Sequence, residues 1–362
     1  MPIIDDIGLK LVQLLPPETA HSATIAALKA GVVRKMAPLS SETLEVLRTD
    51  MPVSGLCLPS VLGVAAGFDK NCEVAAPTLR MGFGFVECGT VTPLPQAGNP
   101  KPRLFRLKED LGVINRMGFN NAGLDAFVSR LKTHADLDLV VGANVGANKT
   151  SQGEKRIADY VEGIEAVWPY CSYLTLNISS PNTPGLRGLQ DKGELTALLG
   201  AASKAISRMQ DVHNVKKPVF LKIAPDIDDE AINDIVSAVV QADGMTGLIV
   251  SNTTISRPDN LMSESASQMG GLSGKPVFEL STHVLRKVAR VSDGRLDIIG
   301  AGGVYDAQSA YAKIRAGAHA VQLYSALVYG GAAMVPQILN GLAKLLEADG
   351  FANIGEAVGA DL

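Results

Sequence analysis

Residues 177–187 read NISSPNTPGLR and continue the apolar run 172–178, and this stretch decides how the chain is interpreted. The β-rich run predicts a buried strand, whereas Pro181, Pro184 and Gly185 prevent regular structure beyond it. Ser180 and Asn182 are therefore expected on a loop at the carboxyl end of a strand. Such loops carry the chemistry of α/β barrels and open α/β sheets, because they converge on one crevice. A plain Ser/Asn/Pro turn is the alternative for this stretch considered alone.

The composition allows a large core, since 46% of the 362 residues are hydrophobic and 19% are charged. One large domain, or a domain with an appendage, is expected. The net charge of -4 and the absence of a Lys/Arg cluster with interleaved aromatic residues argue against a nucleic-acid partner. The cysteines form no Cys-x-x-Cys pair and no close set with histidines, so a reduced protein on the cytoplasmic side, without a metal site, is predicted.

The first residues predict a small helical extension. Residues 3–35 hold two apolar-periodic stretches on either side of Pro16-Pro17, and a further short helix is expected at 41–48. No basic start followed by an apolar core and a cleavage site marks a secretory signal. The two helices could pack on the main domain or lie on a membrane surface. The expected division is residues 1–45 as the extension and residues 46–362 as the main domain.

Beyond residue 54 the chain alternates β-rich apolar runs with helical patterns. Buried strands are predicted at 61–68, 83–91, 137–146, 172–178, 218–224, 247–253, 296–301 and 320–323. Helices are predicted at 73–81, 124–132, 154–168, 193–209, 229–242, 276–291, 307–316 and 332–346. These units close most naturally into a (β/α)8 TIM barrel, so the predicted class is α/β, a barrel with a two-helix extension. A doubly wound sheet is the alternative, and the first turn lacks its Gly-x-Gly-x-x-Gly motif.

Three further segments depart from a minimal barrel. Residues 316–343 carry no Asp, Glu, Lys or Arg, which allows a membrane span as the alternative to a strand, a Gly-Gly turn and a helix start. Residues 92–121 and 254–274 are longer than barrel connections need to be. Both follow predicted strands, so we expect binding loops or lids over the carboxyl-terminal face.

The predicted strand ends are rich in side-chain amides. Asn144, Asn177 and Asn252 follow strands, Asn115 and Asn120 lie in the first long loop, and no histidine follows a predicted strand. An amide offers a donor beside an acceptor, which suits a flat ring with alternating N–H and C=O groups, such as a pyrimidinedione or an isoalloxazine. The turns at Gly302-Gly303 and Tyr324-Ser325 follow the last two strands, where barrels commonly bind phosphate.

Lys222 stands between Leu221 and Ile223 in a predicted buried strand. A buried ammonium group is costly unless an anion accompanies it. In a flavin site it would lie beside the N1 and C2 carbonyl edge, where charge accumulates on reduction. The alternative is an ion pair with a neighbouring carboxylate.

Together these features resemble the class 2, quinone-dependent dihydroorotate dehydrogenases over nearly the whole chain. The resemblance rests on Ala66-Gly67-Phe68-Asp69-Lys70, Asn115-Arg116-Met117-Gly118-Phe119-Asn120, residues 177–187, Ser251-Asn252-Thr253-Thr254 and Gly270-Gly271-Leu272-Ser273-Gly274. It implies that Ser180 is the catalytic base, where class 1 relatives have a cysteine. It implies FMN contacts from Ala66, Gly67, Lys70, Thr90, Asn144, Asn177, Lys222, Ser251, Gly274, Gly303, Tyr324 and Ser325. Substrate contacts are implied for Lys70, Asn115, Arg116, Met117, Gly118, Phe119, Asn177, Asn182, Asn252 and Thr253.

The implied reaction is the oxidation of (S)-dihydroorotate to orotate in de novo pyrimidine (UMP) biosynthesis. Ser180 would take the C5 proton, the C6 hydride would go to flavin N5, and ubiquinone would accept the electrons. Because a free serine is a poor base, the proton must pass on through water or Thr183. The resemblance also implies that the N-terminal helices form a ubiquinone tunnel on the cytoplasmic side of a membrane, the cell membrane in a bacterium, with His21 and either Arg103 or Arg106 as tunnel residues. No obligatory protein partner is expected.

Two rival functions are distinguishable in principle. Another FMN barrel, such as a hydroxy-acid oxidase or an ene-reductase, would call for a His or Tyr acid/base at a strand end. His134, His213, His283 and His319 instead fall in predicted helices or loops. A ligand-binding barrel without turnover is the non-enzymatic alternative, and flavin absorbance in the purified protein would separate the possibilities.

Overall fold

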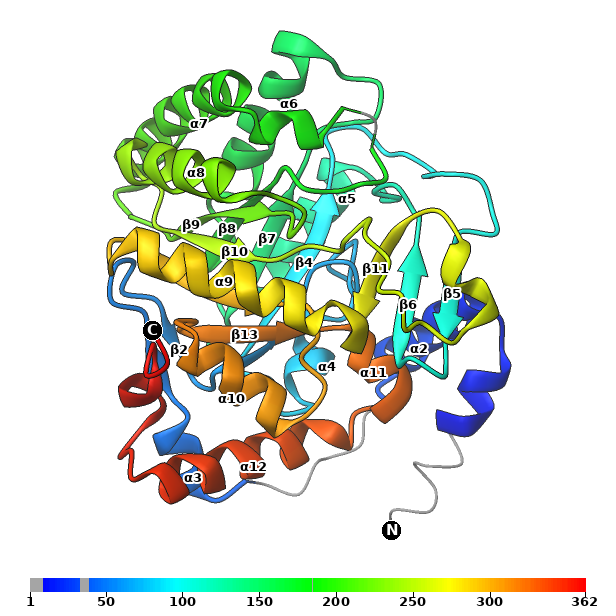
Figure 1. Ribbon diagram of the computed structural model, residues 1–362. Helices are drawn as coiled ribbons and strands as arrows, with labels where there is room; N and C mark the ends of the chain where they lie inside the picture. The colour runs from blue at the N-terminus through cyan, green and yellow to red at the C-terminus, as the bar shows by residue number, and fades with distance from the viewer. Residues whose placement is uncertain (1–8, 33–38, 184) are drawn as a thin grey trace.

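Eight parallel strands close into a barrel in the order in which they occur in the chain, as the computed structural model of residues 9–32, 39–183 and 185–362 shows (Figure 1). The last strand pairs with the first, which confirms the predicted (β/α)8 architecture. The strands are β3 (Leu62–Val64), β4 (Phe85–Val91), β7 (Val141–Val145), β8 (Tyr173–Asn177), β9 (Val219–Ile223), β10 (Gly247–Val250), β12 (Asp297–Ala301) and β13 (Ala320–Leu323).

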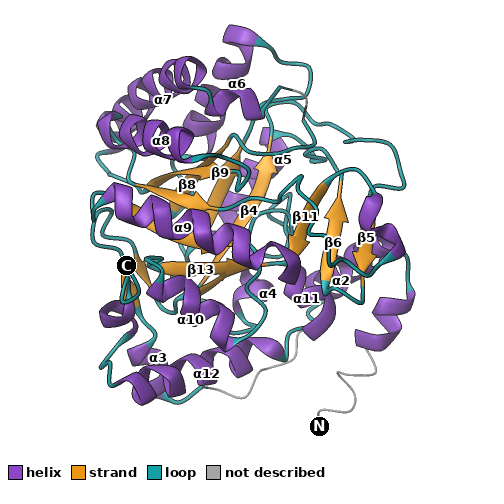
Figure 2. Cartoon of the chain, in the orientation of Figure 1, coloured by secondary structure: helices purple, strands orange, loops and turns teal. Residues whose placement is uncertain are grey.

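Helices surround the barrel as an outer layer (Figure 2). They are α4 (Ala75–Leu79), α5 (Leu124–Leu131), α6 (Gly153–Val167), α7 (Lys192–His213), α8 (Asp229–Gln241), α9 (Phe278–Ser292), α10 (Ala307–Arg315) and α12 (Met334–Asp349). Local signals set several ends: Asp228 caps the amide of Ala231 at the start of α8, and Asp306 with Ser309 forms a capping box on α10. Helix α7 passes its predicted end at residue 209 and stops where Asn214 adopts a left-handed conformation.

Glycine–aromatic pairs fill the barrel interior near the amino ends of the strands. Gly142 is the register partner of Tyr173, and a Cβ on Gly142 would lie 2.1 Å from the ring of Tyr173. Gly63 pairs in the same way with Phe85, and Gly247 with Phe220. The ring of Tyr173 contacts both phenylalanine rings edge to face. Large rings on some strands therefore occupy the space left by glycines on their neighbours, which fills the tapering interior.

A small antiparallel sheet joins the two long connections. Its strands are β5 (Leu104–Leu107), β6 (Gly112–Asn115) and β11 (Gly271–Gly274), with β6 in the centre (Figure 1). Its own small core consists of Leu107, Ile114 and Leu272. Both connections were predicted to be loops or lids, but the pairing between them was not predicted. A two-stranded ribbon of β1 (Thr49–Asp50) and β2 (Cys57–Leu58) was also missed.

The N-terminal segment packs on the barrel and on the small sheet. Residues 9–14 are helical, α2 (Pro17–Lys29) contacts α4 and β5, and α3 (Ser41–Val46) contacts α12. The two predicted helices are confirmed within the described residues, and residues 1–8 and 33–38 lie outside them, as does Pro184. Short 3-10 turns span Lys132–His134, Arg187–Gln190, Glu264–Ser267, Lys275–Val277 and Ile354–Ala357.

The uncharged segment 316–343 does not form a membrane span. It supplies the end of the turn after α10, strand β13, the short helix α11 (Ser325–Gly330) and the first part of α12. Within the described ranges, no helix combines the length and the apolar character that crossing a bilayer requires. The membrane-span alternative is therefore wrong for this segment.

Candidate active site

A cavity of about 660 Å³ opens at the carboxyl ends of the barrel strands. Its floor is formed by strand ends and its walls by the small sheet, and residues of the N-terminal helices line its far side. The volume is in the range of small-molecule sites. Helix α2 lies beside β5 (Figure 1), and residues of both the extension and the barrel line the same cavity.

Four side-chain amides from three segments meet in this cavity. Asn182 Nδ2 donates to Asn115 Oδ1 at 3.3 Å, and Asn252 Nδ2 donates to Asn177 Oδ1 at 3.3 Å and to Ser179 Oγ at 3.0 Å. The same part of the cavity contains a polar atom without a partner: Oγ1 of Thr253 is buried and has no hydrogen-bond partner among the described residues. A site with converging amides and a free hydroxyl suits a polar planar ring.

A hydrogen-bonded relay descends from these amides into the barrel. Asn177 Nδ2 donates to Thr90 Oγ1 at 2.9 Å, and Thr90 Oγ1 donates to Asn144 Oδ1 at 2.5 Å. Asn144 Nδ2 then donates to Oε1 of Glu87 at 2.7 Å. Glu87 is fully buried in the middle of β4 and was not predicted as a site residue.

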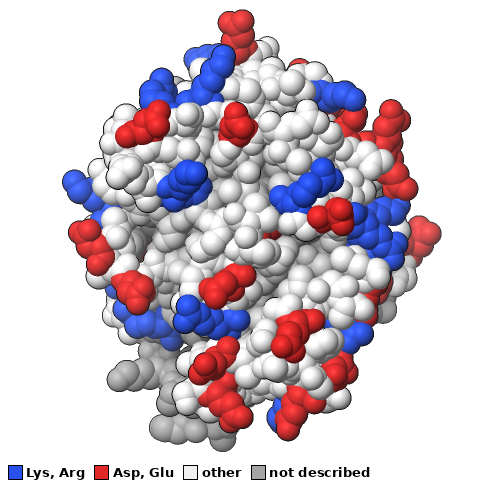
Figure 3. Space-filling model, turned by 90° about the vertical axis from the view of Figure 1, so that its left-hand side faces the viewer, with Lys and Arg blue, Asp and Glu red and all other residues white. Residues whose placement is uncertain are grey.

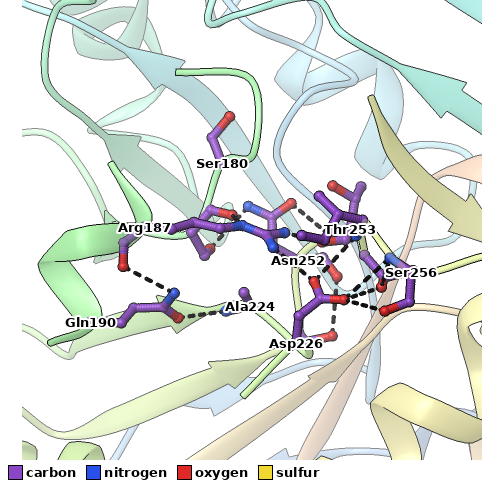
Figure 4. A network of polar contacts seen from close by, with 12 residues as sticks. Ser180, Arg187, Gln190, Ala224, Asp226, Asn252, Thr253 and Ser256 are labelled. Carbon is purple, nitrogen blue, oxygen red and sulfur yellow. Dashed lines mark hydrogen bonds and ion pairs between the residues drawn. The ribbon is translucent and has the colours of Figure 1, made fainter. Parts of the chain in front are cut away.

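Ser180 lies in the cavity wall on the loop after β8, and 5% of its surface is exposed. Its Oγ accepts a hydrogen bond from the amide of Asn182 at 3.3 Å, and Figure 4 shows the hydroxyl turned away from the polar network below it. Oγ1 of the nearby Thr183 is buried and has no hydrogen-bond partner among the described residues. The Ser180 hydroxyl thus lies at a cavity surface and at the same time accepts the i+2 amide of a turn.

An ion pair fixes the loop that carries Ser180. Arg187 Nη1 lies 2.8 Å from Asp226 Oδ2, while Nη2 donates to Thr253 O at 2.9 Å (Figure 4). Nε of Arg187 donates to Ser179 O at 3.3 Å. Asp226 also accepts hydrogen bonds from Thr254 and Ser256, which follow β10. One guanidinium group therefore connects the loops after β8, β9 and β10.

Two lysines line the cavity. Lys70 Nζ donates to Gly67 O at 2.9 Å, and burial lowers the pKa of Lys70 to about 8. Lys222 Nζ lies 3.8 Å from Glu87 Oε1. Burial also lowers the pKa of Lys222, and the charge of Glu87 opposes this shift. The alternative that Lys222 pairs with a carboxylate is therefore confirmed as a contact, and its place in the cavity wall leaves it available to a ligand as well.

Backbone amides face a separate corner of the cavity, at the ends of β12 and β13. Ser281 Oγ donates to Gly302 O at 2.8 Å, so the N–H of Gly303, on the other side of the same trans peptide, points away from Ser281. Both glycines have positive φ, and a Cβ on Gly303 would lie 2.4 Å from Phe278 Cα. Ser325 Oγ donates to Ser273 Oγ at 2.7 Å across the corner. Backbone amides and hydroxyls that line a cavity corner in this way suit a phosphate group.

The entrance beneath the N-terminal helices is aromatic and apolar. The rings of His21, Phe68 and Tyr324 contact one another, and burial with the charge of Lys70 lowers the pKa of His21 to about 3. Arg106 lines this end and donates to the carbonyl oxygens of Gln13 and Leu15 at 2.8 Å and 2.9 Å. Arg103 instead pairs with Glu18 at 2.7 Å and does not line the cavity. Of the two candidate arginines, Arg106 is the one at the entrance.

The structure brings most of the predicted residues to this one cavity. Those that line it are Ala66, Gly67, Lys70, Thr90, Asn115, Met117, Gly118, Phe119, Asn177, Ser180, Asn182, Lys222, Ser251, Asn252, Thr253, Gly274, Gly303, Tyr324 and Ser325. Asn144 lies one layer deeper, against Glu87. The side chain of Arg116 turns outward, where it donates to Pro102 O and Gln268 Oε1 and covers the ring of Phe105. His21 of the extension is in the lining, whereas the four other histidines are not.

One face of the molecule carries charges of both signs. On the face that Figure 3 draws, acidic and basic side chains are interspersed. A mixed surface of this kind differs from the basic stripe that nucleic-acid binding needs. The polar residues of the cavity are consequently the main candidates for function.

Comparison with known proteins agrees with this site. The family model described as dihydroorotate dehydrogenase matches residues 48–346. The chain is 50% identical to the dihydroorotate dehydrogenase (quinone) of Agrobacterium fabrum and 49% identical to that of Azorhizobium caulinodans. These alignments cover 97% and 96% of this chain and 94% and 96% of the relatives. The structure of DHODH from Eimeria tenella in complex with ferulenol superposes with a TM-score of 0.90 at 37% identity and covers 95% of both chains. The chain therefore belongs to the quinone-dependent class 2 of the dihydroorotate dehydrogenase family, which are oxidoreductases of pyrimidine biosynthesis.

Proposed function

We propose that the chain oxidises (S)-dihydroorotate to orotate with FMN as its cofactor and ubiquinone as the electron acceptor. The observation that carries this proposal is the placement of Ser180, four amides and two lysines in one cavity that continues to the N-terminal helices. A site for a planar, amide-recognising ring beside a nucleophilic hydroxyl is what this oxidation needs. The relatives named dihydroorotate dehydrogenase (quinone) support dihydroorotate as the substrate and a quinone as the acceptor.

The residues present fit FMN. The corner formed by Gly274, Gly303, Tyr324 and Ser325 would hold the phosphate, because amides and hydroxyls converge there. Ala66, Gly67, Thr90, Asn177, Ser251 and Lys222 would hold the ring, and Asn144 would act from the layer below. When bound, FMN supplies the acceptor, its N5 atom, for the C6 hydride of the substrate.

Substrate recognition falls to the amides and Lys70. Asn115, Asn177, Asn182 and Asn252 can present donors and acceptors to the edge of the pyrimidine ring, and the charge of Lys70 suits the substrate carboxylate. Met117, Gly118, Phe119 and Thr253 complete the wall. Arg116 would act indirectly, since its side chain braces the loop from outside.

Ser180 would remove the C5 proton. Its hydroxyl accepts only the Asn182 amide within the described residues, so a lone pair remains available to the substrate. The proton must leave the serine, and the unpaired Oγ1 of Thr183 is a candidate acceptor on the route to solvent. Arg187 holds this loop by three separate contacts, which keeps the hydroxyl in place during turnover.

The extension, residues 1–45, would admit ubiquinone from a membrane surface. Leu11 and Leu14 are exposed on the first helix, and His21, Leu28 and Arg106 line the passage below. Exposed leucines on a short amphipathic helix suit a peripheral attachment to the cytoplasmic side of a membrane. Residues 46–362 would then form the FMN-binding barrel.

Anaerobic mixing with dihydroorotate tests the proposal. The purified protein should carry FMN, and its flavin absorbance should bleach within a single turnover and return when a ubiquinone analogue is added. Lactate or an enone in place of dihydroorotate provides the control for other FMN barrels. A flavin that dihydroorotate leaves oxidised would contradict the proposed function.

A further inference from the structure

We infer that Glu87 is a positioning residue whose carboxylate keeps Lys222 charged beneath the cofactor and sets the direction of the hydrogen-bonded relay that reaches the substrate loop. This inference rests on the proposed function, since it concerns the FMN that the cavity would hold. Glu87 itself does not line the cavity. It therefore acts through its neighbours rather than on substrate or cofactor.

The carboxylate of Glu87 is surrounded by donors from four other barrel strands. Oε1 faces Lys222 of β9 at 3.8 Å and accepts from Asn144 of β7 at 2.7 Å. Oε2 accepts from Thr175 Oγ1 of β8 at 3.1 Å and from Gln322 Nε2 of β13 at 3.0 Å. The hydroxyl of Tyr173 lies 3.3 Å from the same oxygen. A fully buried carboxylate with this many donors is held in one orientation.

Glu87 is the one carboxylate within ion-pair distance of Lys222 among the described residues. Burial lowers the pKa of Lys222 and disfavours its ammonium form, and the charge of Glu87 opposes this shift. The other titratable group packed against the pair is Tyr173, and burial with the charge of Glu87 raises the pKa of its hydroxyl well above the ordinary value. Tyr173 therefore stays neutral, and Glu87 is the carboxylate that favours the charged form of Lys222.

The same carboxylate gives the relay its polarity. A carboxylate only accepts hydrogen bonds, so Asn144 must turn its NH2 group to Glu87 and its oxygen to Thr90. Thr90 then donates to Asn144 and accepts from Asn177, whose own oxygen is left to accept from Asn252. The buried charge thus favours the same orientation of Asn177, three residues up the relay, that the backbone N–H of Ser179 favours by donating to Asn177 Oδ1.

The test is the midpoint potential of bound FMN as a function of pH in Glu87→Gln. This variant has nearly the same shape but lacks the charge, so Lys222 should lose its proton as the pH rises. The midpoint potential of the variant should then fall, relative to that of the wild type, as the pH is raised from about 6 to about 9. The expected fall is at least about 30 mV, which corresponds to a tenfold change in the two-electron equilibrium. Curves that stay parallel would overturn the inference.

A matched control separates charge from packing. Thr175→Val removes one donor from Oε2 of Glu87 while the charge remains, so its potential should run parallel to wild type at all pH values. Glu87→Asp keeps the charge and should restore most of the wild-type pH dependence. A purified wild-type protein without FMN would contradict the proposed function itself, whereas flavin-containing variants with parallel curves would contradict only the role of Glu87.

Thermal unfolding provides a second measurement if Glu87→Gln does not retain FMN. Lys222→Met leaves Glu87 as an unpaired buried charge and should lower the melting temperature strongly. Adding Glu87→Gln to that variant removes the unpaired charge and should raise the melting temperature again. A double variant that melts below Lys222→Met would show that the two side chains are not coupled and would overturn the inference.

Discussion

The guanidinium group of Arg187 lies 2.8 Å from the carboxylate of Asp226 and ties the loop of Ser180 to the segment that follows β10. Arg187→Met should lower the rate of flavin reduction about 10²-fold, because a shift of roughly 1 Å in a reacting group has that cost. Arg187→Lys should recover little, since one ammonium group cannot reach Asp226, Ser179 and Thr253 together. Stopped-flow reduction by dihydroorotate measures both variants.

The control for Arg187 is Lys192→Met. It removes an exposed ion pair of the same length, 2.8 Å, to Asp234 on the neighbouring helix. Exposed pairs contribute at most about 1 kcal/mol, so this variant should behave as wild type. Equal losses in the two variants would show that the effect of Arg187 is not specific to the loop.

Ser180→Ala should slow flavin reduction by about 10² to 10⁴, the usual contribution of a positioned base. Orotate binding should change little, because the amides of Asn115, Asn177, Asn182 and Asn252 remain. Ser180→Cys should recover part of the rate, and more of it as the pH approaches about 8.5, where a thiol ionises.

Ser172→Ala is the matched control for Ser180, since Ser172 is hydrogen-bonded to Val141 N at the other end of β8. It should affect melting temperature but not single-turnover reduction. A loss of less than tenfold in Ser180→Ala would exclude Ser180 as the base.

Lys70 should give substrate binding a pH dependence. Burial lowers the pKa of Lys70 to about 8, so its ammonium group is charged below that pH and neutral above it. The KM for dihydroorotate, which is an anion, should therefore rise as the pH passes through about 8. Lys70→Gln should have a high KM at every pH and lack this rise. The assignment fails if both proteins show the same profile.

Arg106→Met should impair the quinone step alone. Arg106 holds the carbonyl oxygens of Gln13 and Leu15 at the end of the first helix, and it lines the entrance. Flavin reduction should keep its rate, whereas reoxidation by a long-tailed quinone should slow about tenfold. The reason is that the lost charge-assisted hydrogen bonds contribute roughly 1.4 kcal/mol, which corresponds to a tenfold change. Lys108→Met, next to the same strand but exposed, is the control. Slower reduction by dihydroorotate in Arg106→Met would argue against a role confined to the entrance.

Deletion of residues 1–40 should leave a folded protein that binds FMN. Helix α3 must be kept, because it packs on α12 and leads to the fully buried Leu47. Dihydroorotate should still bleach the flavin, but liposome binding and the reaction with long-tailed quinones should be lost. Retention of both at wild-type levels would contradict the role of the extension.

The barrel was predictable because each strand and helix carries its own periodic signal. Runs such as Pro218–Ala224 and Leu296–Ala301 are apolar apart from Lys222 and Asp297, as expected for strands covered on both faces. The short sheet was not predictable, since its strands pair across the two insertions and Gly271–Gly274 has little β propensity. Local sequence does not encode such a distant partner.

In the candidate active site, too, some residues could be predicted from local sequence and others could not. Ser180 and Asn182 were found because a proline-rich loop follows a clear strand. Glu87 was missed, although a charged residue inside the run Phe85–Val91 was a usable signal for a buried functional group. Arg116 and Asn144 were grouped with the contact residues, but their side-chain directions depend on Gln268 and Glu87, which are distant in sequence.

The sheet formed by β5, β6 and β11 links the two long insertions, so their sequences cannot change independently. Asn115 is paired at once with Leu104 in its own insertion and with Gly271 in the other. A slip of one residue of β6 against these partners would turn the side chain of Asn115 from the cavity to the opposite face. An engineer who transplants one insertion from a relative must therefore transplant the other, and the two segments should be inherited as one unit.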